Sequence, residues 1–285
     1  MASDAYIPDD SHPAPASECP DEGKRFRPEC ARRLARHMGI LTRMKDTVAG
    51  GICRRTLVII PALNEAETVG CVLSAIKCWQ LAGVRVVDNG STDGTADLAF
   101  IRGAEVIREP RRGYGAACWR GMQDLPVEVE WILFCDADGS DDLWELLPFF
   151  EAAAEDQDLI LGNRNALPES RRVLTPVQRF GNTLAGRLIQ LCWGVRFHDL
   201  GPLRLIRRSS LESLQMEDRG FGWTVEMQAK AAAMGLRIKE IPVAYHPRQG
   251  GKSKIAGTLS GSVKAGTVIL GTLAKLCLRG LRKNG

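Results

Sequence analysis

Features that would mark a transmembrane or secreted protein are missing from these 285 residues. No uninterrupted apolar run reaches the length of about 18–20 residues that a membrane-spanning helix needs. The N-terminus is acidic and rich in proline, and it has no apolar segment of the kind found in signal peptides. The nine cysteines are irregularly spaced without a CxxC pair, and Cys71, Cys135 and Cys192 lie in apolar stretches, as reduced core cysteines do. These absences predict a cytoplasmic protein whose cysteines are reduced.

Each end of the chain lacks one sign of charge: positive charge is absent from the N-terminal end and negative charge from the C-terminal end. Residues 1–22 carry six acidic side chains and no Lys or Arg, whereas residues 248–285 carry eight bases and no acid. Residues 24–55 carry ten bases against two acids, so the stretch 56–247 is net acidic by six charges although the whole chain is +4. Basic flanks on an acidic body predict contact with an anionic surface, either a membrane or a phosphorylated ligand. A solvated basic face is the alternative, and no feature predicts nucleic acid as a partner.

Composition and periodicity divide the chain into four parts. Residues 1–23 form an acidic tail that we expect to be disordered, and residues 24–55 form a basic segment with a helix over 29–47. Strand and helix patterns then alternate through residues 56–256, and a basic amphipathic helix follows over 257–285. The predicted strands are 56–61, 84–87, 106–107, 131–135 and 159–162, and the predicted helices are 66–79, 93–100, 115–124 and 143–154. Such alternation predicts an α/β fold with a largely parallel sheet and helices on both faces.

Two aspartates follow the strand predicted at the centre of the sequence. The apolar run Trp131–Cys135 stops at Asp136-Ala137-Asp138-Gly139, and in an extended chain two carboxylates one residue apart project to the same side. Hard oxygen ligands at a strand end suit Mg²⁺ or Mn²⁺ bound to a substrate diphosphate. A polar turn is the alternative, because Asp and Gly are common turn residues.

Polar residues also follow the other predicted strands. They are Asn64, Glu65, Asp88, Arg111 and Arg112. Because ligands bind outside the carboxyl ends of parallel strands, we expect these residues to converge on one cleft with the aspartate pair. Two arginines beside Gly113 at a helix start favour a phosphate or nucleotide. A nicotinamide-binding motif is disfavoured, since Cys118 stands where GxGxxG has its third small residue, and Asp93 fits a helix cap as well as a binding role.

The second half of the chain offers further polar candidates. Arg164 ends the fifth predicted strand, and Asp199 is a candidate functional acid or acceptor-binding carboxylate. Trp223 and Glu226 begin a helix and face either an acceptor or the core, where Glu226 would serve as a cap. Residues 248–254 (RQGGKSK) combine glycines with three cations and predict an anion-binding turn.

Two apolar segments, 177–193 and 259–281, carry scattered basic residues. A basic amphipathic helix that lies on a membrane fits this pattern. Packing against a partner subunit fits it too, and so does a core-facing helix.

Seven motifs occur in the order and spacing of a known enzyme family. They are Val58–Glu65, Asp88–Thr95, Gly113–Ala117, Asp136–Asp138, Gly162–Arg164, Val225–Met227 and Gly251–Lys254. In these residues the chain resembles glycosyltransferase family 2, and within it the dolichyl- or polyprenyl-phosphate mannose synthase branch. The resemblance implies the GT-A fold, a single Rossmann-like and mostly parallel mixed sheet.

The resemblance and the side-chain chemistry together imply roles for individual residues. Nucleotide-sugar binding is expected of Pro61, Asn64, Glu65, Asp88, Asp93, Arg112, Gly113, Asp136 and Arg164. Binding of an acceptor or a phosphate is expected of Arg204, Trp223, Glu226, Arg248, Ser253 and Lys254. Asp136 and Asp138 would hold Mg²⁺ or Mn²⁺. Two departures concern the acceptor: Gly139-Ser140-Asp141 follows the acidic pair where the lipid-phosphate enzymes have Leu-Gln, and Pro202-Leu203 stands where they have Gly-Phe.

The resulting hypothesis is a metal-dependent, inverting transfer of a sugar from a UDP- or GDP-linked donor to a polyprenyl phosphate. The metal would stabilise charge on the departing diphosphate, and an ionised phosphate acceptor needs no general base. A soluble metabolite or saccharide hydroxyl would need one, and Asp199 is the first candidate, beside Asp138 and Arg204 as catalytic residues. A non-catalytic nucleotide-sugar-binding protein is the third interpretation. We expect the protein to be peripheral on the inner face of a membrane, held by its basic amphipathic helices.

Overall fold

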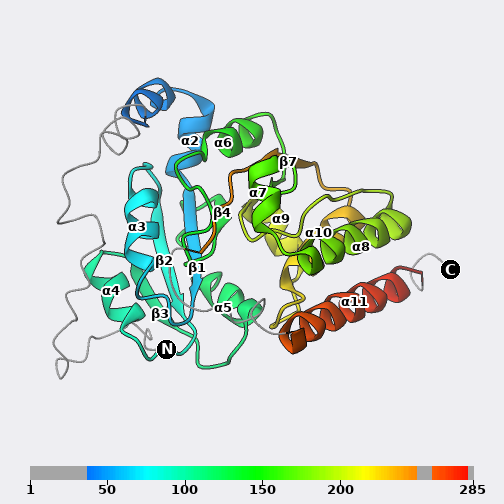
Figure 1. Cartoon of the computed structure of the whole chain (residues 1–285). Coiled ribbons are helices and arrows are strands. Elements are labelled where there is room, and N and C mark those ends of the chain that lie inside the picture. Colours follow the sequence, from blue (N-terminus) through cyan, green and yellow to red (C-terminus); the bar gives the residue numbers. More distant parts are fainter. Residues whose placement is uncertain (1–36, 249–258, 282–285) are drawn as a thin grey trace.

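Seven strands form one mixed sheet in the computed structural model, which describes residues 37–248 and 259–281 (Figure 1). The strands are β1 (Thr56–Ala62), β2 (Gly83–Asp88), β3 (Glu105–Arg108), β4 (Trp131–Phe134), β5 (Leu159–Asn163), β6 (Arg204–Arg207) and β7 (Ile238–Pro242). Their order across the sheet is β3-β2-β1-β4-β6-β5-β7. This α/β sheet has the GT-A arrangement, so the predicted fold class is confirmed.

Helices cover both faces of the sheet (Figure 1). They are α2 (Val48–Arg54), α3 (Val69–Lys77), α4 (Thr95–Ile101), α5 (Tyr114–Gly121), α6 (Leu147–Ala154), α7 (Pro168–Val173), α8 (Pro176–Trp193), α9 (Arg208–Leu214), α10 (Trp223–Ala233) and α11 (Leu259–Leu281). On β1, Val58 and Ile60 pack into one apolar cluster with α2, α3 and α6, whereas Leu57 and Ile59 pack into a second with α5, α8 and α10. Successive strand side chains point to opposite faces, which is why a doubly covered strand is apolar at every position.

The strand order reverses beside β1, and this reversal locates the cleft. β2 and β3 lie on one side of β1, while β4 pairs with it in parallel on the other side. The loops that follow β1 and β4 therefore lead to opposite parts of the sheet and leave a crevice between their strand ends. Glu65 lies on one side of this crevice, and Asp136 and Asp138 lie on the other.

β6 is a strand that the sequence patterns did not predict, and it runs antiparallel to both of its neighbours. Arg204 at its start pairs with Phe134 of β4 and with Leu161 of β5. A four-residue strand with arginine at both ends has neither a long apolar run nor a clear alternation, so its pairing depends on the strands beside it. The other four strand pairs, including β5 with β7, are parallel, as expected of a mostly parallel mixed sheet.

In its described part the helix predicted over 29–47 ends earlier than expected, and a second helix, α2, follows it. Residues 37–44 are helical, and Thr47 then caps α2 by accepting a hydrogen bond from the backbone N–H of Gly50 at 3.1 Å. A Cβ atom on Gly50 would lie 2.0 Å from the carbonyl oxygen of Met44, so only glycine permits this sharp corner. The predicted acidic tail over 1–23 lies outside the described residues.

The prediction of reduced cysteines is wrong at two of its three positions. A disulfide joins Cys192 of α8 to Cys277 of α11, and Cys71 is also disulfide-bonded. Cys135 is a free, buried thiol, as predicted. Cys192 and Cys277 are 85 residues apart in sequence, so only the tertiary structure brings them together.

α8 and α11 lie side by side at one end of the molecule (Figure 1). α8 begins with a capping box, in which Thr175 accepts from the Gln178 N–H at 3.2 Å and Gln178 accepts from the Thr175 N–H at 2.9 Å. Gly194, at φ 78°, ends the helix in a left-handed conformation. In the part of the chain that the structure describes, no helix is long and apolar enough to cross a membrane.

Candidate active site at the carboxyl ends of the strands

Side-chain hydrogen bonds join the loop after β1 to the loop after β2. The backbone N–H of Asn64 donates to Ser91 Oγ at 2.9 Å, and Asn64 Oδ1 accepts from the Thr92 N–H at 2.8 Å. Asp93 accepts from the Ala66 N–H at 3.1 Å. Asn64 has a φ of 50°, a conformation that asparagine tolerates better than most residues. The two loops therefore form one connected wall of the cleft.

The carboxylates of this wall also have local partners. Asp93 accepts from the Thr95 N–H at 3.1 Å and from its hydroxyl at 2.5 Å, so it binds the backbone at the start of α4, although the N-cap residue of that helix is Gly94. Thr95 Oγ1 in turn accepts from the Glu65 N–H at 2.8 Å. Asp88 is buried and accepts from the Ser91 N–H at 3.0 Å. Their predicted nucleotide contacts would add to these bonds.

Pro61 and Arg112 lie at the same edge of the sheet. Pro61 is half-buried in β1, opposite Val87 of β2. Arg112 is exposed, and its guanidinium carbon lies 3.3 Å from where a Cβ atom on Gly90 would be. Gly90, at φ 86°, thus leaves room for a cation at the strand ends.

The glycines at the start of α5 pack against the backbone of a neighbouring loop, in the place where an anion was expected. A Cβ atom on Gly113, which has φ 147°, would lie 2.2 Å from the carbonyl oxygen of Arg219. The N–H groups of Gly115 and Ala116 donate to the carbonyls of Gly220 and Arg219 at 3.0 and 2.9 Å. The Gly113 N–H itself donates to Asn89 Oδ1 at 2.8 Å. Gly113 therefore has no free N–H for the phosphate that this helix start was predicted to receive.

Three carboxylates gather after β4. Asp138 is 3% exposed and accepts from the Ser140 N–H at 2.9 Å. The Asp136 N–H donates to Asp141 Oδ2 at 3.4 Å. Burial first, and then repulsion from Asp138 and Asp141, raises the pKa of Asp136 well above its ordinary value. Burial and the charge of Asp138 raise the pKa of Asp141 to about 7. The cluster has an excess of negative charge that a cation would relieve.

Arg248 is the cation in contact with this cluster. Its Nε atom lies 3.0 Å from Asp138 Oδ2, and its terminal nitrogen lies 3.2 Å from Glu65 Oε1. The arginine thus spans the crevice from the β1 loop to the β4 loop. Burial lowers its pKa, but Asp138 and Glu65 outweigh this effect, so the net pKa is raised. Ser253 and Lys254 lie outside the described residues.

The aspartate pair fits a hard divalent cation as part of a shared site. Among the described residues, no group of three His, Cys, Asp or Glu side chains is placed to hold a metal ion together. Asp136 and Asp138 would therefore supply only some of the oxygens that Mg²⁺ or Mn²⁺ requires. Diphosphate oxygens and water would supply the others, as is usual for Mg²⁺ sites that bind substrate phosphates.

Asp199 and Arg164 form a buried ion pair. Arg164 donates to Asp199 through Nε at 2.7 Å, through a terminal nitrogen at 2.8 Å and through its backbone N–H at 2.9 Å. Asn182 of α8 donates to the same carboxylate at 2.6 Å, and the Leu200 N–H does so at 2.8 Å. The Asp199 oxygens are thus already occupied, and the geometry argues against the predicted general base. Asp199 instead orients Arg164.

Arg204 is buried below the cleft and not presented to an acceptor. It is 1% exposed, and its guanidinium donates to the carbonyl of Thr224 at 3.2 Å and to the carbonyl of Gly201. Burial lowers its pKa, although the charges of nearby acidic groups oppose this. For a direct contact with an acceptor, as predicted, the Arg204 side chain would have to leave these two carbonyl groups.

Trp223 and Glu226 are buried, as the alternative of core packing and capping predicted. Trp223 is 1% exposed and packs against Phe134, with ring centroids 6.2 Å apart. Glu226 accepts from the backbone N–H groups of Glu217 and Asp218 at 2.9 and 2.7 Å. Glu226 thus holds the 215–222 loop and Trp223 packs in the core, so the interpretation as acceptor-binding residues is not supported.

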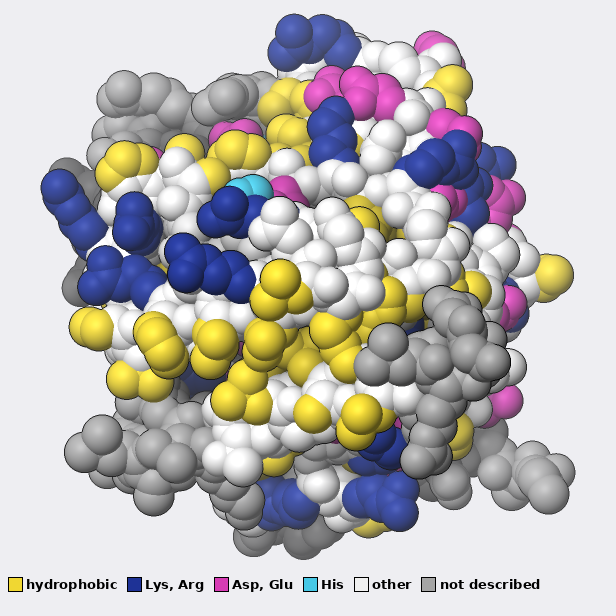
Figure 2. Space-filling model, turned by 90° about the vertical axis from the view of Figure 1, so that its right-hand side faces the viewer, with side chains coloured by type: hydrophobic (Ala, Val, Ile, Leu, Met, Phe, Trp, Pro, Cys, Tyr) yellow, Lys and Arg dark blue, Asp and Glu magenta, His cyan; other side chains and the backbone are white. Residues whose placement is uncertain are grey.

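An apolar cavity of about 490 Å³ lies between α8 and α11. Val177, Phe180 and Leu184 of α8 and Ile269 and Leu270 of α11 line it. Figure 2 looks onto this side of the molecule and shows apolar side chains in a continuous band, with Lys and Arg side chains around it. The predicted amphipathic segments are therefore the two walls of one cavity.

The same cavity reaches the charged residues of the cleft. Asp136, Arg164 and Asn182 line it together with Tyr114. Arg164 is 8% exposed, whereas Phe180 on the other part of the lining is 68% exposed, so the charged end is the buried one. Tyr114 lies in the Gly113–Ala117 motif but was assigned no role, and Asn182 belongs to none of the motifs.

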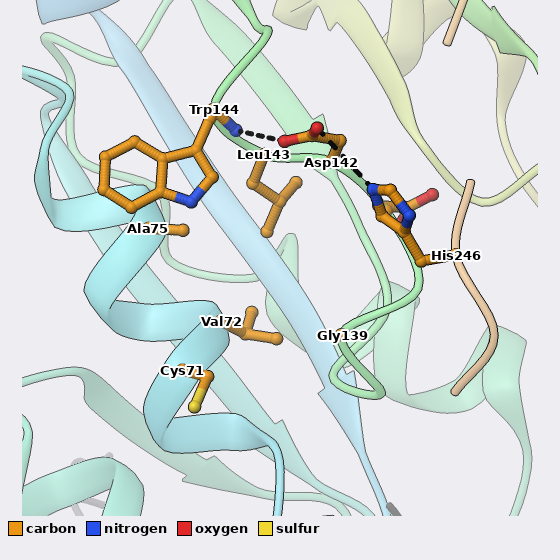
Figure 3. Close-up of a pocket in the computed structure, with 9 residues that line it drawn as sticks. Cys71, Val72, Ala75, Gly139, Asp142, Leu143, Trp144 and His246 are labelled. Atoms are coloured by element: carbon orange, nitrogen blue, oxygen red, sulfur yellow. Dashed lines mark hydrogen bonds and ion pairs between the residues drawn. The ribbon is translucent and has the colours of Figure 1, made fainter. Parts of the chain in front are cut away.

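A second pocket, of about 290 Å³, lies between α3 and the loop that follows Gly139 (Figure 3). Asp142 accepts from the Trp144 N–H at 3.2 Å and lies 3.6 Å from His246 Nε2. The lining includes Cys71 but neither of the two predicted metal ligands. This pocket is therefore distinct from the cavity between α8 and α11.

Comparison with known proteins identifies the family. The sequence model of Glycosyl transferase family 2 matches residues 57–215, more than half of the chain. The chain belongs to glycosyltransferase family 2. An uncharacterized glycosyltransferase of Mycobacterium tuberculosis is 39% identical over 210 residues, which cover 73% of this chain and 93% of that protein. An undecaprenyl-phosphate mannosyltransferase of Micrococcus luteus is 31% identical over 78% of this chain and 96% of its own.

Solved structures with the same fold support this glycosyltransferase architecture. Glucosyl-3-phosphoglycerate synthase from Mycobacterium tuberculosis in complex with uridine diphosphate superposes with a TM-score of 0.63 at 22% identity. The superposition covers 84% of this chain and 83% of that one. The family match contains the strand ends from Asn64 to Arg164 and the buried Asp199, whereas Arg248 and α11 of this glycosyltransferase lie beyond it.

Proposed function

We propose that this glycosyltransferase moves a sugar from a UDP- or GDP-linked donor onto the phosphate of a polyprenyl phosphate. The observation that carries the proposal is the apolar cavity between α8 and α11, because its buried end contains Asp136 and Arg164. A polyprenyl phosphate has the same polarity, with an anionic head on a long apolar chain. The head would lie at Arg164 and the chain between the helices.

The mouth of the cavity supports an acceptor that comes from a membrane. Val177 and Phe180 are 51% and 68% exposed there, and Leu270 is 39% exposed. Exposed apolar side chains beside basic ones are typical of helices that lie in a membrane interface. Arg171 and Arg172, exposed on α7 immediately before α8, would favour anionic lipids. We therefore propose a peripheral membrane attachment through this face.

The proposed reaction is a single displacement. An oxygen of the acceptor phosphate attacks the anomeric carbon of the donor sugar, the bond from that carbon to the nucleotide diphosphate breaks, and the electron pair leaves with the diphosphate. Arg164 would hold the acceptor phosphate, and its bidentate pair with Asp199 fixes the direction of its free N–H groups. A phosphate oxygen carries no proton at neutral pH that must be removed. A phosphate acceptor therefore needs no general base, which agrees with the finding that both Asp199 oxygens already accept hydrogen bonds within the protein.

The donor would occupy the crevice between β1 and β4. Asn64, Asp88 and Asp93 would contact the nucleoside, and Asp136 and Asp138 would hold Mg²⁺ or Mn²⁺ on the diphosphate. When bound, such an ion stabilises the negative charge that accumulates on the leaving group. The uridine diphosphate in the structurally similar synthase supports a UDP-linked donor as the first one to test.

A soluble phosphorylated acceptor is the second candidate. The structures that share the fold include a glucosyl-3-phosphoglycerate synthase in complex with phosphoglyceric acid. The relative whose name specifies undecaprenyl phosphate is more similar in sequence, at 31% against 21% identity. Both acceptors would present an anion to Arg164, so the apolar cavity is what distinguishes them.

The test is a transfer assay with purified protein, Mn²⁺ or Mg²⁺, and panels of UDP- and GDP-sugars. Each donor is paired with undecaprenyl phosphate in detergent or with 3-phosphoglycerate. We expect a sugar-phosphate lipid as the product. Transfer to 3-phosphoglycerate alone would reject the lipid acceptor, and no metal-dependent turnover of any donor would support the non-catalytic alternative.

A pair of variants tests the cavity itself. Phe180→Asp places a charge in the apolar wall, whereas Phe100→Asp changes an exposed phenylalanine on α4. We expect Phe180→Asp to raise the KM for undecaprenyl phosphate at least about tenfold, since an apolar chain that binds against the new charge would remove it from water. Phe100→Asp should leave the KM unchanged, and neither variant should alter UDP binding. In flotation with anionic liposomes, Phe180→Asp should bind less than Phe100→Asp.

A further inference from the structure

We infer that Arg248 competes with the divalent cation for Asp138 and thereby couples metal binding to nucleotide binding. The inference rests on the proposed function, because it concerns the metal and the diphosphate of that site. It deepens the proposal by assigning regulation of the site to one side chain of this chain. Arg248 would be a positioning residue that changes partners, from carboxylates to phosphate, when the donor binds.

The contacts of Arg248 are those of a substitute cation. Its guanidinium is 3.0 Å from Asp138 and 3.2 Å from Glu65, two carboxylates on opposite sides of the crevice. Both carboxylates are buried, whereas the Arg248 side chain is 30% exposed. The arginine therefore reaches into the crevice from its rim, and it can leave without disrupting the core.

The second arginine near the cluster does not share this position. Arg164 lowers the pKa of Asp136 through its charge, as Arg248 does. Its guanidinium, however, is held by a bidentate pair with Asp199 and lies over the Tyr245 ring at 4.8 Å. Among the described residues, Arg248 is thus the basic side chain that is paired with Asp138.

A metal ion on Asp138 and a guanidinium on the same oxygen exclude each other. The Arg248 Nε atom contacts Asp138 Oδ2, one of the oxygens that would ligate the ion. Two cations on one carboxylate oxygen would repel each other strongly in a crevice that is partly shielded from water. Metal binding without nucleotide must therefore displace Arg248, and this lowers the apparent affinity for the metal.

A diphosphate provides the displaced arginine with a new partner. It adds several anionic oxygens beside the metal, and guanidinium binds phosphate through paired hydrogen bonds. Arg248 then no longer opposes the metal and instead stabilises the nucleotide. Because coupling between two ligands is reciprocal, metal and diphosphate should each strengthen the binding of the other.

The test measures Mn²⁺ binding by electron paramagnetic resonance and UDP binding by calorimetry on the full chain. The variants are Arg248→Gln, Arg248→Lys, Asp138→Asn and the control Arg54→Gln. Arg54 is an exposed arginine at the end of α2, so the control removes the same charge away from the crevice. GDP replaces UDP if UDP does not bind.

Two opposite changes are expected in Arg248→Gln. Mn²⁺ alone should bind about tenfold tighter than in the wild type, and UDP at saturating Mn²⁺ should bind about tenfold more weakly, within the usual range of coupling between sites. The Mn²⁺ and UDP affinities of Arg248→Lys should lie between those of the wild type and Arg248→Gln, because a lysine keeps the charge but loses the paired geometry. Arg54→Gln should match the wild type.

Other outcomes would overturn one proposal or the other. Unchanged or weaker Mn²⁺ binding in Arg248→Gln would reject the competition, and unchanged UDP binding would reject the change of partner. Either result would leave the proposed function standing if Asp138→Asn still loses Mn²⁺. If Asp138→Asn binds Mn²⁺ and UDP as the wild type does, the metal site itself is wrong, and with it the proposed function.

Discussion

The two sides of the cleft, proposed to bind the donor and the acceptor and named the donor side and the acceptor side, are built by different means. On the donor side, short loops after β1 and β2 are joined by hydrogen bonds of 2.8–3.1 Å between side chains and backbone, as between Asn64 and Thr92. On the acceptor side, α8 and α11 contribute apolar side chains and are linked by the disulfide between Cys192 and Cys277. One side is a polar network of local segments, and the other is an apolar contact between distant ones.

This difference matches what each side is proposed to bind. A nucleotide has fixed hydrogen-bonding groups, and a rigid polar wall can recognise them. A polyprenyl chain has none, and it needs only an apolar surface between two helices. Arg164 and Asp136 lie where the two sides meet, which is why we propose that donor and acceptor come together there.

The largest expected effect lies on the donor side, at Asp138. We expect Asp138→Asn to lower kcat about a thousandfold, because loss of the carboxylate weakens the binding of the ion that stabilises the leaving group. The measurement is sugar transfer at saturating donor, together with thermal stabilisation by Mn²⁺ and UDP. Asp124→Asn is the matched control, since the Asp124 side chain is 93% exposed. A loss below tenfold would mean that Asp138 does not bind the metal.

At the junction of the two sides, Asp199→Ala should cost the most stability. It leaves the Arg164 guanidinium buried without its carboxylate, and such a change costs about 3–5 kcal/mol in the free energy of unfolding. Asp158→Ala is the control, because its partners Arg207 and Arg237 are 33% and 50% exposed and water can replace the carboxylate. Urea unfolding of both variants gives the comparison. Equal losses would contradict the importance of the buried pair.

The disulfide tests whether the acceptor side depends on a covalent link. Replacing Cys192 and Cys277 by serine should lower the free energy of unfolding by about 2–4 kcal/mol, since the bond closes a long loop. Hydrogen exchange should quicken in α11, while UDP binding stays the same. Cys78→Ser, at a half-buried free thiol, is the control. Weaker UDP binding in the double variant would show that the two sides are not independent.

The smallest effect is expected for the loop network of the donor side. Asp93→Ala removes the acceptor of the Ala66 and Thr95 N–H groups and should cost about 1–2 kcal/mol of stability, because both donors lose their hydrogen bond. UDP should bind several-fold more weakly. Asp93→Asn keeps an acceptor oxygen and should recover most of the stability. If Asp93→Asn were as unstable as Asp93→Ala, the charge of Asp93 and not its hydrogen bonds would be the important property.

Sequence patterns predicted correctly which residues lie at the strand ends of the proposed donor side, because the determinants of that placement are local. A polar residue directly after an apolar strand is visible in the chain, and parallel strands bring such residues to one edge. Asn64, Glu65, Asp88, Asp136 and Asp138 lie at the strand ends as expected. The GT-A fold and membership of glycosyltransferase family 2 were also predicted correctly.

The acceptor side was predicted less well because its contacts join distant segments. Arg204 lies in an antiparallel strand and is buried, and Trp223 packs in the core. Asp199 was expected to act as a base but binds Arg164 instead. The disulfide was missed for the same reason, since no spacing in the chain indicates that Cys192 meets Cys277.

The sequence by itself determined the order of the first five strands, the helices between them and the acidic pair at the end of β4. Apolar runs, turns and motif spacing are properties of neighbouring residues, so they can be recognised without the tertiary structure. Only the tertiary structure decided that Arg248 reaches Asp138 and that α8 and α11 enclose a cavity. Both depend on how segments about 85 or more residues apart pack, and packing is set by the shape and burial of the whole core.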